Sequence, residues 1–157
     1  MSSAVTFEEA TALLADYAYA LDDGNLAAWP SFFTDPCLYR ITTREMYRQG
    51  RPLSIMLCDN HAMLYDRVEA TERVNIFEPH HYRHVLSRSR PIDALAACLH
   101  LQTGFICVRT MADGAQSLFV SGEYRDEIVR GPARCLLRAR TVILDSSRID
   151  HLIAIPL

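Results

Sequence analysis

The chain has 157 residues, half of them hydrophobic, and a formal net charge of −3. This length suits one domain with a single core, so residues 1–157 are expected to fold as one unit without disulfide bonds. Acidic and basic residues are mixed along the chain, which excludes the electrostatic footprint of a protein that binds nucleic acid or an anionic membrane.

The N-terminus and the cysteines indicate a cytoplasmic protein. Residues 1–5 lack the basic and apolar regions of a secretory signal, and no apolar run approaches about 18 residues, the length that would span a membrane. The five cysteines are an odd number and widely spaced, which favours free, buried thiols in a reducing compartment. They are Cys37, Cys58, Cys98, Cys107 and Cys135.

Three segments have the pattern of helices. Thr6 and Glu9 have the spacing of a capping box, and the apolar residues that follow predict a helix from about Thr6 to Asp22. A short helix is expected after Asn25, and an amphipathic helix is expected from Asn60 to about Phe77. The short helix carries on one side Leu26, Trp29, Phe32 and Phe33.

The remaining segments favour strands. Cys37–Thr43 and Pro52–Leu57 predict two strands, with a turn over Arg44–Arg51. Later segments alternate or run apolar over strand lengths and predict a curved antiparallel meander. These are His80–Arg90, Ala96–Met111, Gln116–Val129 and Arg134–Leu144.

Helices first and sheet second predict an α+β fold, with the helices packed on one face of a bent sheet. Such a sheet closes into a cone around a cavity, which either holds a ligand or is filled by side chains. The apolar tail Ile149–Leu157 would either finish the sheet or dock elsewhere.

Two fragments of an iron–sulfur motif occur in the wrong order. A Rieske site needs Cys-x-His followed by Cys-x-x-His, because two thiolates hold one iron and two imidazoles hold the other. Here Cys98-Leu99-His100 follows the Cys58 to His61 fragment, and a helix and a strand are expected between them. We therefore expect no cluster in this chain.

The histidines after residue 79 are poor candidates for one metal site. On a regular strand, His81 and His84 point to opposite faces, whereas His80 and His84 share a face but lie about 13 Å apart. A mononuclear iron site of two histidines and a carboxylate would need a bulge or turn here. We expect these histidines to be hydrogen-bonded or to lie at an interface.

Other functional classes stay open at this point. A cone-fold isomerase or dehydratase would use a buried His–Asp pair, favoured by an aspartate that meets His84 inside an open cavity. A small-ligand-binding protein predicts the cavity without the pair. Motifs of serine nucleophiles, phosphate loops and dinucleotide binding are absent from the sequence. The acid–base candidates are Tyr17, Tyr39, Asp59, His84 and Glu123, although the helical spacing of Tyr17 favours a core position.

Two charged segments lie on predicted strands. Residues 123–126, Glu-Tyr-Arg-Asp, predict an outward-facing row of ion pairs or a polar contact surface. Arg138 and Arg140 are expected on one strand face, opposite Cys135, Leu137 and Ala139, where they suit cross-strand or intersubunit salt bridges.

Several blocks together resemble the small (beta) subunit of aromatic-ring-hydroxylating dioxygenases. The likeness is collinear over nearly the whole chain and is nearest to the branch that acts on aromatic carboxylates, such as the terephthalate and salicylate oxygenases. The blocks are Trp29–Tyr39, Asn75–Glu78, His81–His84, Ser121–Tyr124 and Arg140–Asp145.

The resemblance implies a nuclear-transport-factor-2-like cone and a non-catalytic, structural subunit. It implies a large (alpha) subunit as partner, with three copies of each chain, and places the Rieske [2Fe-2S] cluster and the mononuclear iron in that partner. A reductase or ferredoxin would act on the complex only indirectly. No catalytic, cofactor-binding or metal-binding residue is then expected here, and the interface candidates are His81, Tyr82, Arg83, His84, Glu123, Arg125, Arg138 and Arg140.

Overall fold

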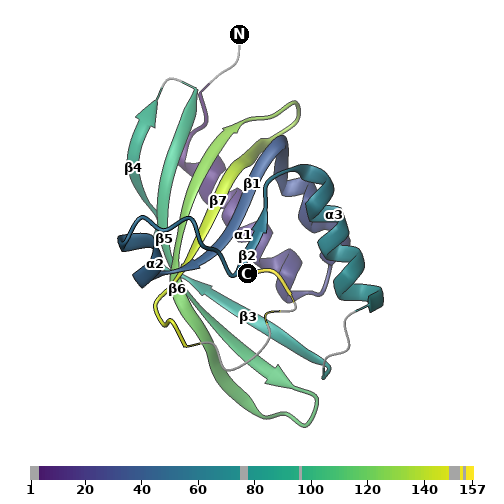
Figure 1. Cartoon of the computed structure of the whole chain (residues 1–157). Coiled ribbons are helices and arrows are strands. Elements are labelled where there is room, and N and C mark those ends of the chain that lie inside the picture. The colour runs from purple at the N-terminus through teal and green to yellow at the C-terminus, as the bar shows by residue number, and fades with distance from the viewer. Residues whose placement is uncertain (1–3, 75–77, 96, 149–152, 154) are drawn as a thin grey trace.

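The two longest helices pack against a curved, seven-stranded sheet in the computed structural model (Figure 1). The structure describes residues 4–74, 78–95, 97–148, 153 and 155–157. The strand order is β2-β1-β7-β6-β5-β3, and β4 pairs with the same long strand, β5. The α+β class expected from the sequence is confirmed.

Helix α1, Phe7–Asp22, begins with both halves of the predicted capping box. The Glu9 backbone N–H donates to Thr6 Oγ1 at 3.2 Å, and the Thr6 N–H donates to the Glu9 carboxylate at 2.9 Å. Helix α1 buries the apolar stripe that the sequence indicates, including Leu14 and Tyr17. A 3-10 helix, Leu26–Phe32, follows.

The segment after α1 differs from prediction at its ends. Phe33 does not continue the short helix but opens strand β1, Phe33–Thr43. The predicted turn after β1 contains helix α2, Arg44–Arg48, because the Thr43 hydroxyl caps it by accepting from the Met46 N–H at 3.2 Å. The predicted strand Pro52–Leu57 is reduced to β2, Met56–Cys58, which is the part that pairs with Tyr39–Ile41 of β1.

Helix α3, His61–Glu69, begins at the expected cap, where Asn60 Oδ1 accepts from the Met63 N–H at 3.0 Å. It ends earlier than predicted and continues as one π-helical turn, Ala70–Val74. The predicted end of this helix at Phe77 lies outside the described residues. Among the residues that the structure places, no helix is long and apolar enough to cross a membrane.

The second half of the chain builds most of the sheet. The predicted strand His80–Arg90 is in fact two strands, because Ser89 turns inward and its hydroxyl bonds that of Thr103 at 2.7 Å. The predicted strand from Ala96 is described from Cys98, and Ala96 itself lies outside the described residues. The strands are β3, His80–Leu86; β4, Arg90–Leu95; β5, Cys98–Met111; β6, Gln116–Arg130; and β7, Cys135–Leu144.

Strands β3, β5, β6 and β7 pair antiparallel, as the meander predicts, whereas β1 pairs parallel to β7. The ladders are interrupted between Cys107 and Val108 on β5 and between Glu127 and Ile128 on β6. Such bulges bend strands and increase their twist, so they help the sheet to curve around its core.

Most of the predicted tail Ile149–Leu157 lies outside the described residues, but its last residue docks inside the curved sheet. Leu157 is fully buried, and its carbonyl oxygen accepts from the hydroxyls of Tyr17 at 2.9 Å and Tyr39 at 3.0 Å. The Leu157 N–H donates back to the Tyr39 hydroxyl, and Trp29 Nε1 donates to Tyr17 at 2.9 Å. The end of the described chain therefore occupies the centre of the core.

Removing the Tyr39 hydroxyl should destabilise the fold. Tyr39→Phe leaves the buried N–H of Leu157 without its partner, which costs about 1–3 kcal/mol. Urea unfolding measures this loss, with Tyr19→Phe as control because Tyr19 is 60% exposed. Equal stability of the two variants would contradict this account of the tail.

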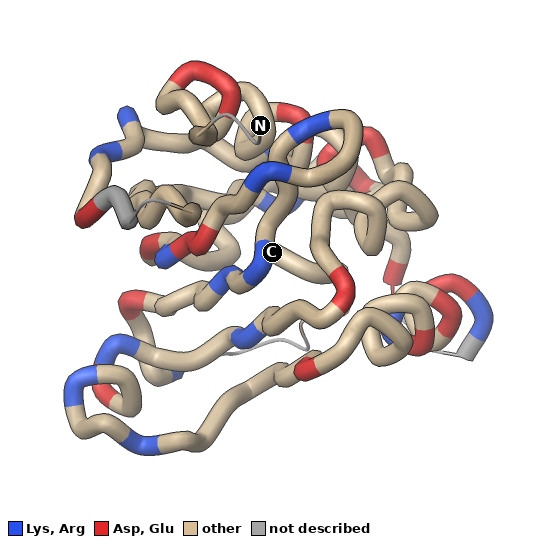
Figure 2. Tube along the Cα trace, turned by 90° about the horizontal axis from the view of Figure 1, so that it is seen from above, with Lys and Arg blue, Asp and Glu red and all other residues tan. Residues whose placement is uncertain are grey.

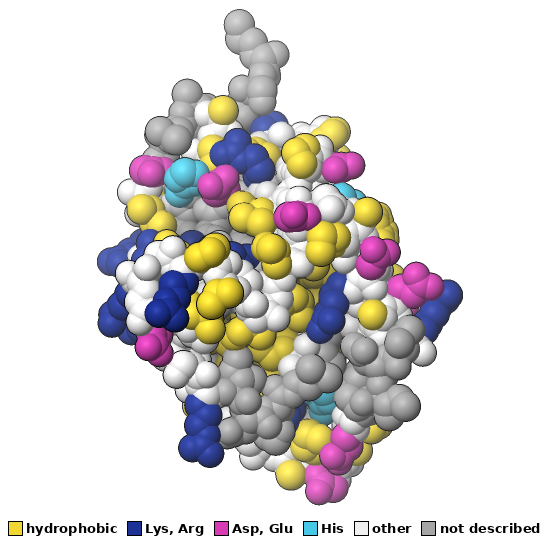
Figure 3. Space-filling view, viewed as in Figure 1, with side chains coloured by type: hydrophobic (Ala, Val, Ile, Leu, Met, Phe, Trp, Pro, Cys, Tyr) yellow, Lys and Arg dark blue, Asp and Glu magenta, His cyan; other side chains and the backbone are white. Residues whose placement is uncertain are grey.

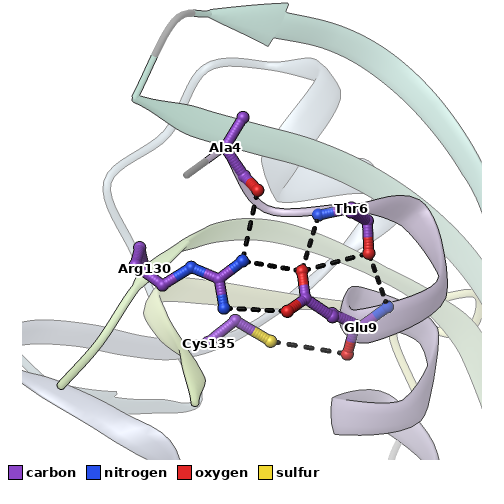
Figure 4. A network of polar contacts seen from close by, with 5 residues as sticks. All are labelled: Ala4, Thr6, Glu9, Arg130 and Cys135. Atoms are coloured by element: carbon purple, nitrogen blue, oxygen red, sulfur yellow. Dashed lines mark hydrogen bonds and ion pairs between the residues drawn. The ribbon is translucent and has the colours of Figure 1, made fainter. Parts of the chain in front are cut away.

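A polar network fixes the start of α1 to the end of β6 (Figure 4). Both guanidinium nitrogens Nη1 and Nη2 of Arg130 bond the Glu9 carboxylate, at 2.8 and 2.7 Å. Arg130, with the backbone and hydroxyl of Thr6, lowers the pKa of Glu9 to about 2. The Glu9 carboxylate thus closes the capping box and ties helix to sheet.

The network predicts a pH dependence. Because the folded-state pKa of Glu9 is depressed below its ordinary value of 4.5, its stabilisation is present above pH 4.5 and is lost as pH falls toward about 2. Above pH 4.5 the Glu9→Gln variant should therefore have a smaller free energy of unfolding than the wild type, and this difference should shrink as the pH falls toward about 2. Urea titrations measure the difference, with Glu8→Gln in the same turn as control. A difference independent of pH would contradict the assignment.

Candidate functional site

The interior of the curved sheet holds a buried ion pair. Arg140 donates from Nε and Nη2 to the two carboxylate oxygens of Asp126, at 2.8 and 2.9 Å. The two residues are direct partners on β7 and β6 and are 1% and 2% exposed. The guanidinium carbon lies 4.1 Å from the ring centroid of Tyr17 and 3.9 Å from that of Tyr124.

The pair is held charged by its own members. Burial raises the pKa of Asp126, and the Arg140 guanidinium opposes that shift. Burial disfavours the charge on Arg140, but the Asp126 carboxylate and the nearby Tyr17 and Tyr124 together outweigh this effect, so the pKa of Arg140 is raised. Both carboxylate oxygens are occupied, which leaves Asp126 unsuited to act as a general base.

A second pair joins α1 to β3. Asp22 accepts from the backbone N–H of His84 at 2.9 Å, and its other oxygen lies 2.6 Å from His84 Nδ1. The side chains of His84 and Asp22 are 0% and 2% exposed. His84 Nε2, which has no hydrogen-bond partner among the described residues, faces the core near the rings of Tyr82 and Phe105.

The His–Asp pair is buried and borders a pocket at the surface of the described chain. This pocket, about 230 Å³, lies between α1 and β3 and is lined by Asp22 and His84 themselves together with Tyr19 and Arg83. Aromatic side chains and Leu157 belong to the hydrophobic core that the curved sheet helps to form. The geometry therefore makes His84 and Asp22 a structural link between helix and sheet.

The other acid–base candidates do not converge on His84. Tyr17 and Tyr39 bind the backbone of Leu157 deep in the core. Asp59 is exposed before α3, and Glu123 bonds Gln102 and Arg125 on the outer side of β6. These positions give no shared site for proton transfer.

The iron–sulfur fragments are also far apart. Cys58 lies on β2 and Cys98 on β5, with three strands between them in the sheet. His61 Nε2 lies 2.9 Å from the carbonyl oxygen of Pro30. The residues present therefore do not fit a Rieske cluster, as the order of the fragments predicts.

The predicted interface residues of β3 divide between two faces. His81 and Arg83 are exposed, whereas Tyr82 and His84 are buried against α1 and the core. Alternate positions of a strand explain this division. Only the outward pair is available on the surface of the chain.

Residues 123–126 divide in the same way. Glu123 and Arg125 form an outward ion pair at 2.9 Å, but Tyr124 and Asp126 point into the core. The predicted outward row of four is therefore wrong for Tyr124 and Asp126. Strict strand alternation would have separated them, but only the β6–β7 register identifies Arg140 as the partner of Asp126.

Arg138 and Arg140 do not share a face. The irregularity between Glu127 and Ile128 pairs Glu127 with Ala139 and Ile128 with Leu137, so Arg138 is the extra residue. Arg138 is consequently half exposed and bonds Glu127 at 3.0 Å, while Arg140 is buried. Both arginines do form the cross-strand salt bridges that the sequence suggested as one alternative.

The outer side of the sheet carries an apolar band, which the sequence analysis missed. Val85, Ile106 and Leu118 are 55%, 45% and 64% exposed. Val85 pairs with Ile106, and Leu118 pairs with Val108 two residues further along β5, so the band crosses three strands. Figure 3 shows another mixed surface, on which hydrophobic side chains lie next to charged ones. Figure 2 shows that acidic and basic residues are interspersed along the chain.

A family model described as the ring hydroxylating beta subunit matches residues 17–151. The chain belongs to this family. The sequence resemblance to small subunits of ring-hydroxylating dioxygenases is thereby confirmed.

Individual relatives agree with the family assignment. The chain is 34% identical to the anthranilate 1,2-dioxygenase small subunit of Burkholderia cepacia, over 90% of this chain and 88% of the relative. It is 35% identical to the terephthalate 1,2-dioxygenase beta 1 subunit of a Comamonas species, over 91% and 93%. Both names contain an aromatic carboxylate, as the predicted branch requires.

A solved structure supports the fold of this beta-subunit family. The crystal structure described as the beta subunit of an aromatic-ring-hydroxylating dioxygenase from Novosphingobium aromaticivorans has a TM-score of 0.86 and 31% identity. The similarity covers 96% of this chain and 95% of that chain. The expected nuclear-transport-factor-2-like cone is confirmed.

The buried ion pair of this family member should behave as a unit. Asp126→Leu or Arg140→Met alone leaves one buried charge unpaired and should cost about 3–5 kcal/mol of unfolding free energy. The double variant should recover much of that loss, because no unpaired charge remains. Urea unfolding of all four proteins measures the coupling, and additive losses would contradict it.

Proposed function

We propose that this chain is the non-catalytic small subunit of a Rieske non-haem iron ring-hydroxylating oxygenase. It folds as one domain over residues 1–157, works in the cytoplasm and holds large catalytic subunits together. The observation that carries the proposal is the family match over residues 17–151, and the burial of Leu157 and of the Arg140–Asp126 pair in the core agrees with it.

The proposed partner is the large (alpha) subunit, with three copies of each chain in the complex. The Rieske [2Fe-2S] cluster and the mononuclear iron belong to that subunit, which exchanges electrons with a reductase or ferredoxin. The separation of Cys58 from Cys98 supports this division of labour, because the only Rieske-like fragments in the sequence cannot meet.

The proposed substrate class is an aromatic carboxylate, which the complex hydroxylates. This rests on the relatives of anthranilate and terephthalate dioxygenases, each about one third identical to the chain. The large subunit would provide the substrate pocket, and the present chain would act on turnover only through assembly.

The proposed docking surface for the large subunit is the outer apolar band, Val85, Ile106 and Leu118, with His81 and Arg83 beside it. These apolar side chains stay largely exposed in the isolated chain, and large apolar patches mark sites of association. The polar row of Glu123 and Arg125 borders the band and suits the polar rim of such an interface.

A charge placed in the band should weaken assembly. Leu118→Glu would bury an unpaired carboxylate against the large subunit, and we expect roughly 10- to 100-fold weaker association, about 1–3 kcal/mol. Tyr65→Glu is the matched control, because Tyr65 on α3 is 56% exposed and lies outside the band. Size-exclusion chromatography of mixtures with the large subunit measures both.

Two results would contradict the proposal at different levels. Equal assembly of Leu118→Glu and wild type would reject the docking surface but leave the subunit role intact. Turnover of terephthalate or anthranilate by the purified chain without a large subunit would reject the non-catalytic role itself.

A further inference from the structure

A cluster of metal-ligating side chains lies where β4, β5 and β6 meet. Cys98 and His100 stand two residues apart on β5 and therefore share a face, and Glu127 on β6 is the cross-strand partner of His100. One ligand atom from each of these three residues lies within 4.8 Å of the other two. The sheet register thus places a thiol, an imidazole and a carboxylate around one point.

The imidazole is oriented toward that point by Asp93. Asp93 on β4 pairs with His100, and its Oδ1 lies 2.6 Å from His100 Nδ1. A carboxylate at this distance takes the Nδ1 proton as a hydrogen bond and leaves the lone pair of the neutral ring on Nε2. Metal-binding histidines are commonly held in this way by a carboxylate behind them.

His100 Nε2 is shielded from solvent and has no hydrogen-bond partner in the described part of the chain. The nearest oxygen of Glu127, Oε1, lies 4.0 Å away, which is too long for a hydrogen bond. A shielded, unsatisfied nitrogen is costly unless something binds it. A cation between His100, Glu127 and Cys98 would satisfy it.

The charges around the point suit a divalent cation. Arg138 holds the other oxygen of Glu127, Oε2, at 3.0 Å and fixes the direction of the carboxylate. Three groups at the point carry a negative charge when zinc is bound: the Cys98 thiolate and the carboxylates of Glu127 and Asp93. The Arg138 guanidinium cancels one of these charges, which leaves a net charge of two negative units. A bound dication would make the cluster neutral.

We propose that Cys98, His100 and Glu127 bind a zinc ion, with Asp93 as a positioning residue and water in the fourth position. Zinc accepts sulfur, nitrogen and oxygen ligands at about 2.0–2.3 Å in a tetrahedron, so the ligand atoms need to close by about 1 Å. Zinc binds the thiolate, so zinc binding at neutral pH releases the proton of the Cys98 thiol to solvent as the sulfur–zinc bond forms. This site is separate from the proposed subunit role.

Metal titration of the chelator-treated full chain tests the proposal. Each chain should bind one Zn²⁺ ion. With Co²⁺ in its place, the visible absorption spectrum should show the bands of tetrahedral cobalt and a thiolate-to-cobalt charge-transfer band. Cys98→Ser should abolish the charge-transfer band, and Glu127→Gln should weaken Co²⁺ binding. Asp93→Asn should keep the band but lower affinity about 10- to 100-fold, because its effect passes through His100.

Cys37→Ser and His81→Asn are controls that should bind Co²⁺ as the wild type does. Circular dichroism checks that each variant folds. If the buried Cys98→Ser variant fails to fold, Glu127→Gln still tests the site, because the Glu127 side chain is 41% exposed. Loss of the band in Cys37→Ser would overturn the proposal. The absence of binding at about 100 µM Co²⁺ or Zn²⁺ would also overturn it, because this concentration is far above the dissociation constant of an ordinary structural zinc site.

Discussion

The buried contact between Arg140 and Asp126 constrains the rest of the structure. A charge in the core is tolerated only with its partner and its hydrogen bonds in place, so both strands must keep one register. The guanidinium also lies against Tyr17, whose hydroxyl binds Trp29 and Leu157. Sheet, first helix and the described end of the chain are thereby connected through one arginine.

On the proposed subunit role, function is carried out at the surface of the chain. One fold can serve as an enzyme or as a scaffold, and the side chains decide which. Here the His84–Asp22 pair, which could serve as an acid–base pair in an open cone, is enclosed and links α1 to β3. The exposed apolar residues of the outer sheet face, such as Leu118, are instead available to a partner.

Local patterns predicted the elements that local interactions determine. The capping box at Thr6 and the period of the apolar residues located α1, and the alternation of β3 correctly placed His81 and His84 on opposite faces. The collinear motifs identified the family, because they sample most of the chain without requiring any contact to be known.

Features that depend on distant pairing could not be predicted. The irregularity beside Glu127, which separates Arg138 from Arg140, exists only in the ladder between β6 and β7. Asp22 lies 62 residues from His84, and no spacing rule connects them. The Cys98–His100–Glu127 cluster depends on the β5–β6 register, which brings Glu127 next to His100. In the sequence alone, Cys98 and His100 show only the Cys-x-His fragment of a Rieske motif.

The most direct test of the account is native mass spectrometry of the chain coexpressed with its large subunit. A structural small subunit predicts one assembly that contains three copies of each chain and dissociates only when the outer sheet face is altered. A large subunit that forms its active oligomer while this chain stays unbound would contradict the central claim.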